Sequence, residues 1–329
     1  MSDLHEAAAV IEPPVDTTDM EAIRARLRME LASAEISGAE AAKMIGLGGS
    51  TLLAWMGGKY AGDNAKVAKL VATWLEARPT QARVQMTHAP VCFTATKTAQ
   101  AFVAVLETAQ FAPDIVVIAG GAGVGKTTTC RHYAATHRNV WLLTAEPAMA
   151  SDFAVLERLC VLHGVREYSP AARSFALQQK MMGSNGLIVV DEAQHLRTGA
   201  IEQLRSLHDL AGVGLALVGN ESVYARIDGG GRRAEFAQLF SRVGMRMRRP
   251  KPYRDDIEAL LDAHDVTGDP ERKLLKAVAS KPGALRAMVK TIRVARMLAQ
   301  VAGEEFTADH VRTAWQRVAD TAPIESEAA

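Results

Sequence analysis

A chain of 329 residues with 48% hydrophobic composition can bury one large core or the cores of two to three domains. No apolar run approaches the ~18–20 residues of a membrane-spanning helix, so we expect no membrane-embedded part. The three cysteines, Cys92, Cys130 and Cys160, form no C-x-x-C pair, which argues against a disulfide framework and a zinc site. The net charge of +1 conceals an uneven distribution, because acids gather towards the termini and bases gather in two later stretches.

The first part of the chain combines an acidic tail with a helical block. Residues 1–18 carry four acids and two prolines without a helical period, so we expect a flexible tail. The tail lacks the basic and apolar regions of a signal peptide, which predicts a cytoplasmic protein. A compact domain is expected at 19–78, with amphipathic helices at 20–33, 38–45, 50–56 and 64–76. Short helix, glycine turn and short helix is the helix-turn-helix pattern.

The segment from Ile36 to Asp63 resembles the small N-terminal DNA-binding domain of the B transposition proteins of Mu-like phages, and more loosely the phage-repressor helix-turn-helix family. The matching residues are Ala41, Ala42, Gly46, Trp55, Gly58, Tyr60, Gly62 and Asp63. The third helix offers Ser50 and Thr51 but no Arg, Asn or Gln for bidentate contacts with bases. Lys43 and Lys59 suit phosphates, so we expect binding of duplex DNA with little sequence preference. A four-helix bundle that contacts protein instead of DNA remains the alternative.

Strands alternate with helices in the middle of the chain, after a proline-containing linker expected at 79–91. Apolar runs predict strands at 115–119, 140–144, 187–190 and 215–218, with a weaker one at 244–248. Helices are expected at 98–110, 127–137, 152–163 and 171–182. The fold class is therefore α/β with a parallel sheet, in a core domain expected at 92–250. A purely helical, basic lid is expected at 251–320, followed by a tail at 321–329.

A glycine-rich loop follows the strand expected at 115–119 and opens the next helix. From Gly120 its spacing is G-x-x-x-x-G-K-T, the phosphate-binding loop, in the strand–loop–helix context that this motif requires. Backbone N–H groups and the helix dipole bind phosphates there, Lys126 reaches the β- and γ-phosphates, and the Thr127 hydroxyl suits Mg²⁺. The expected ATP-binding residues are Gly120, Gly121, Ala122, Gly123, Val124, Gly125, Lys126, Thr127 and Thr128.

Two adjacent carboxylates, Asp191 and Glu192, end the strand expected at 187–190. This is a Walker B box, in which Asp191 holds Mg²⁺ through water and Glu192 polarises the water that attacks the γ-phosphate. The strand expected at 140–144 lies between the two boxes in the sequence. Together with Glu192, it resembles the branch of phosphate-loop ATPases that has a catalytic glutamate and an extra central strand. An acidic strand end that merely caps the next helix is the alternative.

Residues 92–320 resemble the AAA+ ATPases, and the resemblance implies three further catalytic residues. Asn220, at the end of the strand expected at 215–218, resembles sensor 1, which orients the lytic water; a helix N-cap is the alternative. Arg242 resembles the arginine finger that completes a neighbouring subunit's site, although Arg232 and Arg233 compete for this role and an ordinary surface arginine has the same pattern. Arg286, after Pro-Gly-Ala-Leu, resembles sensor 2.

Two stretches are strongly basic. Residues 232–254 hold eight Arg and Lys against Glu235 alone, and residues 272–303 hold eight against no acid. An ordinary solvated face mixes both signs, so the second stretch favours a polyanion such as the phosphate backbone of double-stranded DNA. The bases expected to contact DNA there are Lys281, Lys290, Arg293 and Arg296.

Together these features resemble the AAA+ ATPases that deliver target DNA in transposition by Mu-like phages. The resemblance implies a homo-oligomer, as a ring or helical filament on DNA, that recruits a transposase in the cytoplasm of a bacterial host. Insertion-sequence helper ATPases and helicase loaders are the nearest alternatives, and an ATP-regulated transcription factor is a more distant one. A helicase lacks support because no second motor domain is visible, and a secretion ATPase lacks support because no membrane-attached portion is visible.

Overall fold

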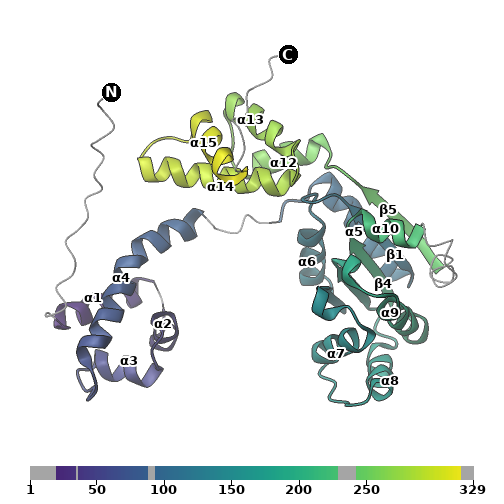
Figure 1. Cartoon of the computed structure of the whole chain (residues 1–329), viewed down its shortest axis with the longest axis horizontal. Coiled ribbons are helices and arrows are strands. Elements are labelled where there is room, and N and C mark those ends of the chain that lie inside the picture. The colour runs from purple at the N-terminus through teal and green to yellow at the C-terminus, as the bar shows by residue number, and fades with distance from the viewer. Residues whose placement is uncertain (1–19, 35, 88–92, 229–241, 320–329) are drawn as a thin grey trace. The chain divides into compact units, whose positions relative to one another are not determined.

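The computed structural model describes residues 20–34, 36–87, 93–228 and 242–319 (Figure 1). The tails expected at 1–18 and 321–329 lie outside these residues, as do Arg232 and Arg233. The chain divides into two compact units, Met1–Ala89 and Pro90–Ala329. Among the described helices, none has the length and apolar character needed to cross a membrane.

The first unit consists of four helices around one apolar core. They are α1 (Met20–Ser33), α2 (Gly38–Ile45), α3 (Gly49–Met56) and α4 (Asn64–Thr87). A capping box starts α2, because the Ser37 hydroxyl accepts from the Glu40 N–H while the Glu40 carboxylate accepts from the Ser37 N–H. Gly46 ends α2 with φ of 81°, which glycine adopts without strain. Trp55 of α3 is fully buried, with the Arg24 guanidinium 4.9 Å from its ring centre.

Helix α4 continues to Thr87, so part of the stretch that we expect to be linker is helical. Pro79 suggests a break, because proline lacks an N–H and its ring crowds the preceding turn. The residues that follow it, Gln-Ala-Arg-Val-Gln-Met from 81 to 86, are mostly strong helix formers, and their propensity favours continuation of the helix.

A five-stranded parallel sheet forms the centre of the second unit. Its strands are β1 (Ile115–Gly120), β2 (Val140–Thr144), β3 (Leu187–Asp191), β4 (Gly214–Gly219) and β5 (Val243–Arg249). Their order across the sheet is β2-β3-β4-β1-β5, and all neighbours are parallel. The predicted α/β class with a parallel sheet is confirmed.

The position of the extra central strand differs from the sequence-based expectation. Strand β4 lies between β1 and β3, with Val116 paired to Ala216 and Ile188 paired to Leu215. Strand β2, which lies between the two motifs in the sequence, is at the edge of the sheet beside β3. The burial agrees with this order, because β4 is buried along its whole length whereas three residues of β2 are only half-buried.

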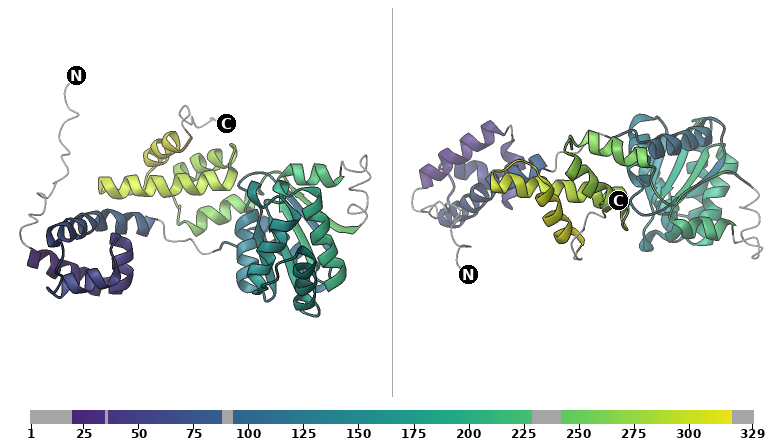
Figure 2. Two further views of the ribbon diagram at one scale, coloured as in Figure 1. Left: turned by 60° about the horizontal axis from the view of Figure 1, so that its bottom comes forward. Right: turned by 90° about the horizontal axis from the view of Figure 1, so that it is seen from above.

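Helices cover both faces of the sheet (Figure 2). On one face, α5 (Lys97–Phe111) and α6 (Lys126–Thr136) pack through Phe102, Leu106 and Tyr133 against alternate residues of the strands. On the other face lie α7 (Asp152–His163), α8 (Pro170–Met181) and α9 (Thr198–Ala211), and their core includes Leu159 and Leu204. Short helices η1 (Pro147–Met149), η2 (Ala193–His195) and α10 (Glu221–Asp228) follow β2, β3 and β4. The continuous burial of β1, β3 and β4 is the expected result of helices on both faces of the sheet.

Four helices follow β5 and form a core of their own. They are α12 (Arg254–Ala263), α13 (Asp269–Ala279), α14 (Ala284–Ala302) and α15 (Ala308–Ala319), packed around residues such as Met288 and Ile292. The buried Asp256 joins α12 to α5, because its carboxylate accepts hydrogen bonds from the Thr98 N–H at 2.9 Å and the Thr98 hydroxyl at 2.5 Å. A buried carboxylate that is satisfied in this way fixes the start of the helical lid to the ATPase core.

Candidate active site

The phosphate-binding loop connects β1 to α6. Gly123 and Gly125 have φ of 80° and 98°, in the left-handed region that turns successive N–H groups towards a common point. Lys126 is 9% exposed, and its Nζ donates to the carbonyl oxygens of Gly120 and Gly121, each at 2.9 Å. The ammonium is therefore held over the loop, where a bound phosphate chain would lie.

Backbone from two other segments packs against the outer side of this loop. A Cβ atom on Gly121 would lie 2.2 Å from the Pro250 carbonyl oxygen, and one on Gly123 would lie 1.8 Å from the Gly283 carbonyl oxygen. Both distances are far shorter than van der Waals contact, so these two positions require glycine for space as well as for conformation. The end of β5 and the start of α14 thereby contact the loop directly.

The charges around Lys126 show which predicted residues the fold brings together. Burial lowers the pKa of Lys126, Glu192 and Asp191 raise it, and Arg286 lowers it. Two carboxylates and a second cation therefore act on the same ammonium, although they come from β3 and α14. The predicted Walker A lysine, Walker B acids and sensor 2 arginine lie at one end of the sheet, where parallel strands present ligand sites.

Asp191 and Glu192 have different surroundings at the end of β3. Asp191 is 1% exposed, and its Oδ1 accepts the Glu192 N–H at 3.0 Å. Glu192 has φ of 56° and ψ of 35°, a left-handed conformation that costs a non-glycine residue free energy. Its Oε2 accepts a hydrogen bond from Nε2 of Gln194. The left-handed residue Glu192 thus directly follows the buried Asp191, and its carboxylate is held by Gln194.

Thr127 and Asp191 have the chemistry that Mg²⁺ prefers. One supplies a hydroxyl at the start of α6 and the other a carboxylate at the end of β3, and both are oxygen donors. Among the described residues, no group of three or more His, Cys, Asp and Glu side chains could hold a metal. A hydroxyl and a carboxylate suit Mg²⁺, which keeps several waters and takes other ligands from phosphates.

Asn220 follows β4 and caps the next helix. Its Oδ1 accepts from the Ser222 N–H at 2.9 Å and from the Ser222 hydroxyl at 2.6 Å, which satisfies the first turn of α10. Asn220 therefore has the geometry of a helix N-cap, the alternative to a sensor 1 role. The backbone N–H of Asn220, however, donates to Oε1 of Gln194 at 3.3 Å, so Asn220 is connected to Glu192 through one intervening side chain.

Arg286 lies in the first turn of α14, directly after an unusual piece of backbone. Gly283 has φ of 95° and Ala284 has φ of 43°. The N–H nitrogen of Arg286 would be 3.3 Å from a Cβ on Gly123, so the backbone of this turn lies beside the phosphate-binding loop. The Arg286 side chain is exposed and close enough to Lys126 to lower its pKa. It can therefore approach a bound nucleotide from the lid.

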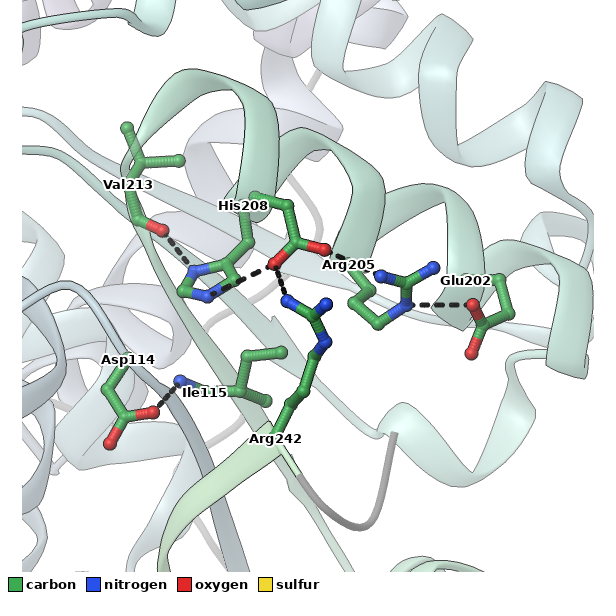
Figure 3. A network of polar contacts seen from close by, with 8 residues as sticks. Asp114, Ile115, Glu202, Arg205, His208, Val213 and Arg242 are labelled. Atoms are coloured by element: carbon green, nitrogen blue, oxygen red, sulfur yellow. Dashed lines mark hydrogen bonds and ion pairs between the residues drawn. The ribbon is translucent and has the colours of Figure 1, made fainter. Parts of the chain in front are cut away.

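Arg242 lies at the end of the sheet away from the phosphate-binding loop. Figure 3 shows it beside Arg205 and His208 of α9. It directly precedes β5. Because β1, β4 and β5 are parallel, all three strands start at the end of the sheet away from the phosphate-binding loop, which follows β1. Its Nη1 donates to Oδ1 of Asp209 at 2.8 Å, and Oδ2 of Asp209 accepts from Arg205 at 2.6 Å. The Arg242 side chain is 54% exposed, so it is available to a second molecule but not to its own nucleotide site.

The basic stretch from 272 to 303 divides into paired and exposed bases. Arg272 contacts Glu258 and Asp262 of α12, each at 2.7 Å, and Lys276 contacts Glu258 at 2.5 Å. The Arg296 guanidinium donates to the His264 carbonyl oxygen, and Arg293 is half-buried. Lys281 and Lys290 are exposed. Acids on another helix thus compensate part of a run that contains no acid of its own.

The residues of the first unit that we expect to contact DNA lie on its surface. Lys43 of α2, Ser50 of α3 and Lys59 are exposed, and Thr51 is half-buried. Leu53 of α3 is also exposed, at 57%. These residues offer lysines to phosphates but only hydroxyl and apolar groups to bases.

Comparison with known proteins decides the family. The family profile described as "Mu B transposition protein, C terminal" matches residues 241–318, and the one described as "AAA domain" matches residues 109–227. The ATP-dependent target DNA activator B of Escherichia phage Mu is 35% identical over 300 residues, which cover 90% of this chain and 95% of that protein. The chain belongs to the Mu B transposition protein family. The predicted resemblance is confirmed.

A further member of the Mu B family is the Mu-like prophage FluMu DNA transposition protein B of Haemophilus influenzae. It is 34% identical over 271 residues, with 81% of this chain and 93% of that protein covered. Among solved structures, a RuvB variant from Thermotoga maritima aligns at 17% identity and a TM-score of 0.45, covering 67% of this chain and 69% of that one. The Drosophila ORC bound to DNA aligns at 17% and 0.47, covering 70% and 65%.

Gln194 is the residue of this Mu B family site that the sequence does not predict. The motif Asp-Glu-Ala-Gln at 191–194 contains it, but nothing in the sequence indicates that the glutamine side chain contacts Glu192. A signal was available in Gly219, since a glycine at the end of a buried strand often marks close approach by another group. The structure gives that reason, because a Cβ on Gly219 would lie 2.5 Å from Oε1 of Gln194.

Proposed function

We propose that this Mu B family member is an ATPase that binds double-stranded target DNA in its ATP-bound form and activates a transposase. The observation that carries the proposal is that Lys126, Asp191, Glu192 and Arg286 lie close together at one end of the sheet. The chain is also similar over 90% of its length to proteins named as ATP-dependent target DNA activators. We place its activity in the cytoplasm of a bacterial host, where phage DNA is transposed.

The residues of the site have distinct tasks in hydrolysis. The loop N–H groups and Lys126 bind the phosphates, and Thr127 and Asp191 hold Mg²⁺. Bound Mg²⁺–ATP supplies the transferable phosphoryl group and a cation that neutralises its charge. Glu192 accepts the proton of the attacking water, and Arg286 adds positive charge from the lid. Asn220 has its Oδ1 occupied by the cap of α10, so only its side-chain NH₂ group remains to orient water.

The position of Arg242 supports the proposal that the protein oligomerises. In its own chain this arginine lies at the start of β5, at the end of the sheet away from Lys126. It can therefore complete only the site of another copy. A head-to-tail contact of this kind generates a ring or a helical filament. Such an assembly also aligns the exposed Lys281 and Lys290 of successive copies, which suits continuous binding to a phosphate backbone with little sequence preference.

The test is a strand-transfer assay with the transposase of the same mobile element, donor DNA and unrelated target duplexes. We expect ATP and this protein together to increase insertion into all targets, and we expect ADP to give no increase. Insertion that is independent of this protein would contradict the activating role. Unwinding of duplex DNA would favour a helicase, and a footprint confined to one sequence would favour a transcription factor.

A further inference from the structure

We propose that Gln194 is a positioning residue, which orients the Glu192 carboxylate for hydrolysis and couples it to the end of β4. This role rests on the proposed ATPase function and adds to it a residue that the Walker and sensor motifs do not include. Hydrogen-bond polarity, the space around the side chain and the backbone that places it all support the role.

The polarity of the two contacts requires an amide. Nε2 of Gln194 donates to the Glu192 carboxylate, and Oε1 of Gln194 accepts the Asn220 N–H at 3.3 Å. A carboxylate can only accept and a backbone N–H can only donate, so the group between them needs a donor at one end and an acceptor at the other. Glutamine meets this requirement, whereas glutamate of the same size would place a second acceptor against Glu192.

The space around this side chain indicates a built contact. A Cβ on Gly219 would lie 2.5 Å from Oε1 of Gln194 and 3.5 Å from the backbone nitrogen of Ala193. Cγ2 of Val223 would be equally near, at 2.5 Å, so a larger residue at 219 would displace the glutamine amide, the valine or both. The absence of a side chain at 219 therefore leaves room for the Gln194 amide to reach the end of β4 beside Val223.

The backbone directs the side chain of residue 194 back towards Glu192. Glu192 has the left-handed φ of 56°, and the short helix η2 follows, with the His195 N–H bonded to the Glu192 carbonyl oxygen at 3.1 Å. Strained conformations of this kind persist where surrounding contacts hold them. The hydrogen bond from Gln194 is one such contact, since it connects the strained residue to the rigid end of the neighbouring strand.

The coupling has a mechanical consequence. Asn220 anchors the acceptor end of Gln194 and is also the N-cap of α10, so a shift of α10 moves the backbone N–H that holds the amide. That movement would reorient the Glu192 carboxylate without any change at the phosphate-binding loop. We therefore expect Gln194 to affect the turnover of bound ATP and to have little effect on ATP binding.

The experiment compares Gln194→Ala, Gln194→Glu and the parent in the full chain with Mg²⁺, ATP and duplex DNA. We expect both substitutions to lower kcat about tenfold or more, a part of the ~10²–10⁴ that a positioned base contributes, with KM within about twofold of the parent. The matched control is Gln203→Glu on α9, where the amide bonds Ser174 at 3.1 Å far from the motif, and we expect parental kcat and KM.

A second measurement detects the contact without turnover. In nucleotide-free protein, thermal unfolding of Glu192→Ala, Gln194→Ala and the double variant forms a cycle, and we expect the two midpoint shifts to be non-additive. Additive shifts, or a Gln194→Glu variant with parental kcat, would overturn the inference. A parent that hydrolyses no ATP would instead refute the proposed function, while the unfolding cycle would still decide whether Gln194 holds Glu192.

Discussion

The phosphate-binding loop and the helical lid of α12 to α15 belong to the same unit but are held in place by different kinds of contact. The loop is fixed by backbone, since its glycines contact the carbonyl oxygens of Pro250 and Gly283 and its lysine bonds two carbonyls of the loop itself. Two cations of the lid, Arg272 and Lys276 of α13, are instead held by a side chain of another helix, Glu258 of α12. A short motif therefore carries the information for the first region, whereas the second depends on residues that the motif does not contain.

The largest effect is expected at the loop. Lys126→Ala removes the charge that neutralises the β- and γ-phosphates, so we expect ATP binding to be abolished or nearly so. Equilibrium binding of a fluorescent ATP analogue measures it. Lys273→Ala, a change at an exposed lysine of α13, is the matched control and should bind as the parent does. Equal affinity in the two variants would show that the loop is not the nucleotide site.

The second effect separates binding from hydrolysis at the same edge of the sheet. Glu192→Gln keeps the size of the side chain but removes the base, so we expect normal ATP affinity and a decrease in hydrolysis of about 10²–10⁴-fold. Phosphate release in a single turnover measures this directly. Hydrolysis at the parental rate would show that Glu192 is not the catalytic base. Catalysis would then not explain its strained backbone conformation.

The third prediction concerns Arg242, at the end of the sheet away from the phosphate-binding loop. Arg242→Ala should leave ATP binding intact but remove the DNA-stimulated part of hydrolysis, since a finger acts across a subunit boundary. Mixing is the decisive measurement. Arg242→Ala protein combined with Glu192→Gln protein should recover activity, because some mixed interfaces join an intact Glu192 to an intact Arg242. Co-assembly of the two without any recovery would contradict the role in trans.

The smallest effect tests whether the basic run acts through its total charge or through particular residues. Replacing Lys281 and Lys290 with alanine should weaken DNA binding on unrelated sequences and flatten the log–log salt slope by about 0.9 for each phosphate that is no longer neutralised. Replacing Arg272 and Lys276 removes the same charge from residues that are paired with α12. We expect this second pair to change the slope less, and equal slopes in the two variants would refute the distinction.

These two regions also show how far sequence reasoning reaches. Both Walker motifs and the strands that carry them were predictable, because each strand is a local apolar run and each motif is local chemistry. The order of the strands was not predictable, because it depends on pairing between strands that are far apart in the sequence. The strand between β1 and β3 is β4, and not β2, which follows the phosphate-binding loop in the sequence. Gln194 and the pairing of Arg272 were missed for the same reason, because Asn220 and Glu258 are distant in the sequence.

Dependence of DNA binding on the state of the nucleotide tests the central claim most directly. Binding isotherms of the full chain on a random duplex should be measured with no nucleotide, with ADP and with ATP, for the parent and for Glu192→Gln. We expect tight DNA binding only with ATP, and we expect DNA binding to be half-maximal at the ATP concentration that fills half of the nucleotide sites. We also expect slower release of DNA from Glu192→Gln than from the parent. Identical isotherms in all three nucleotide conditions would contradict the account, because the site around Lys126 would then have no connection to DNA.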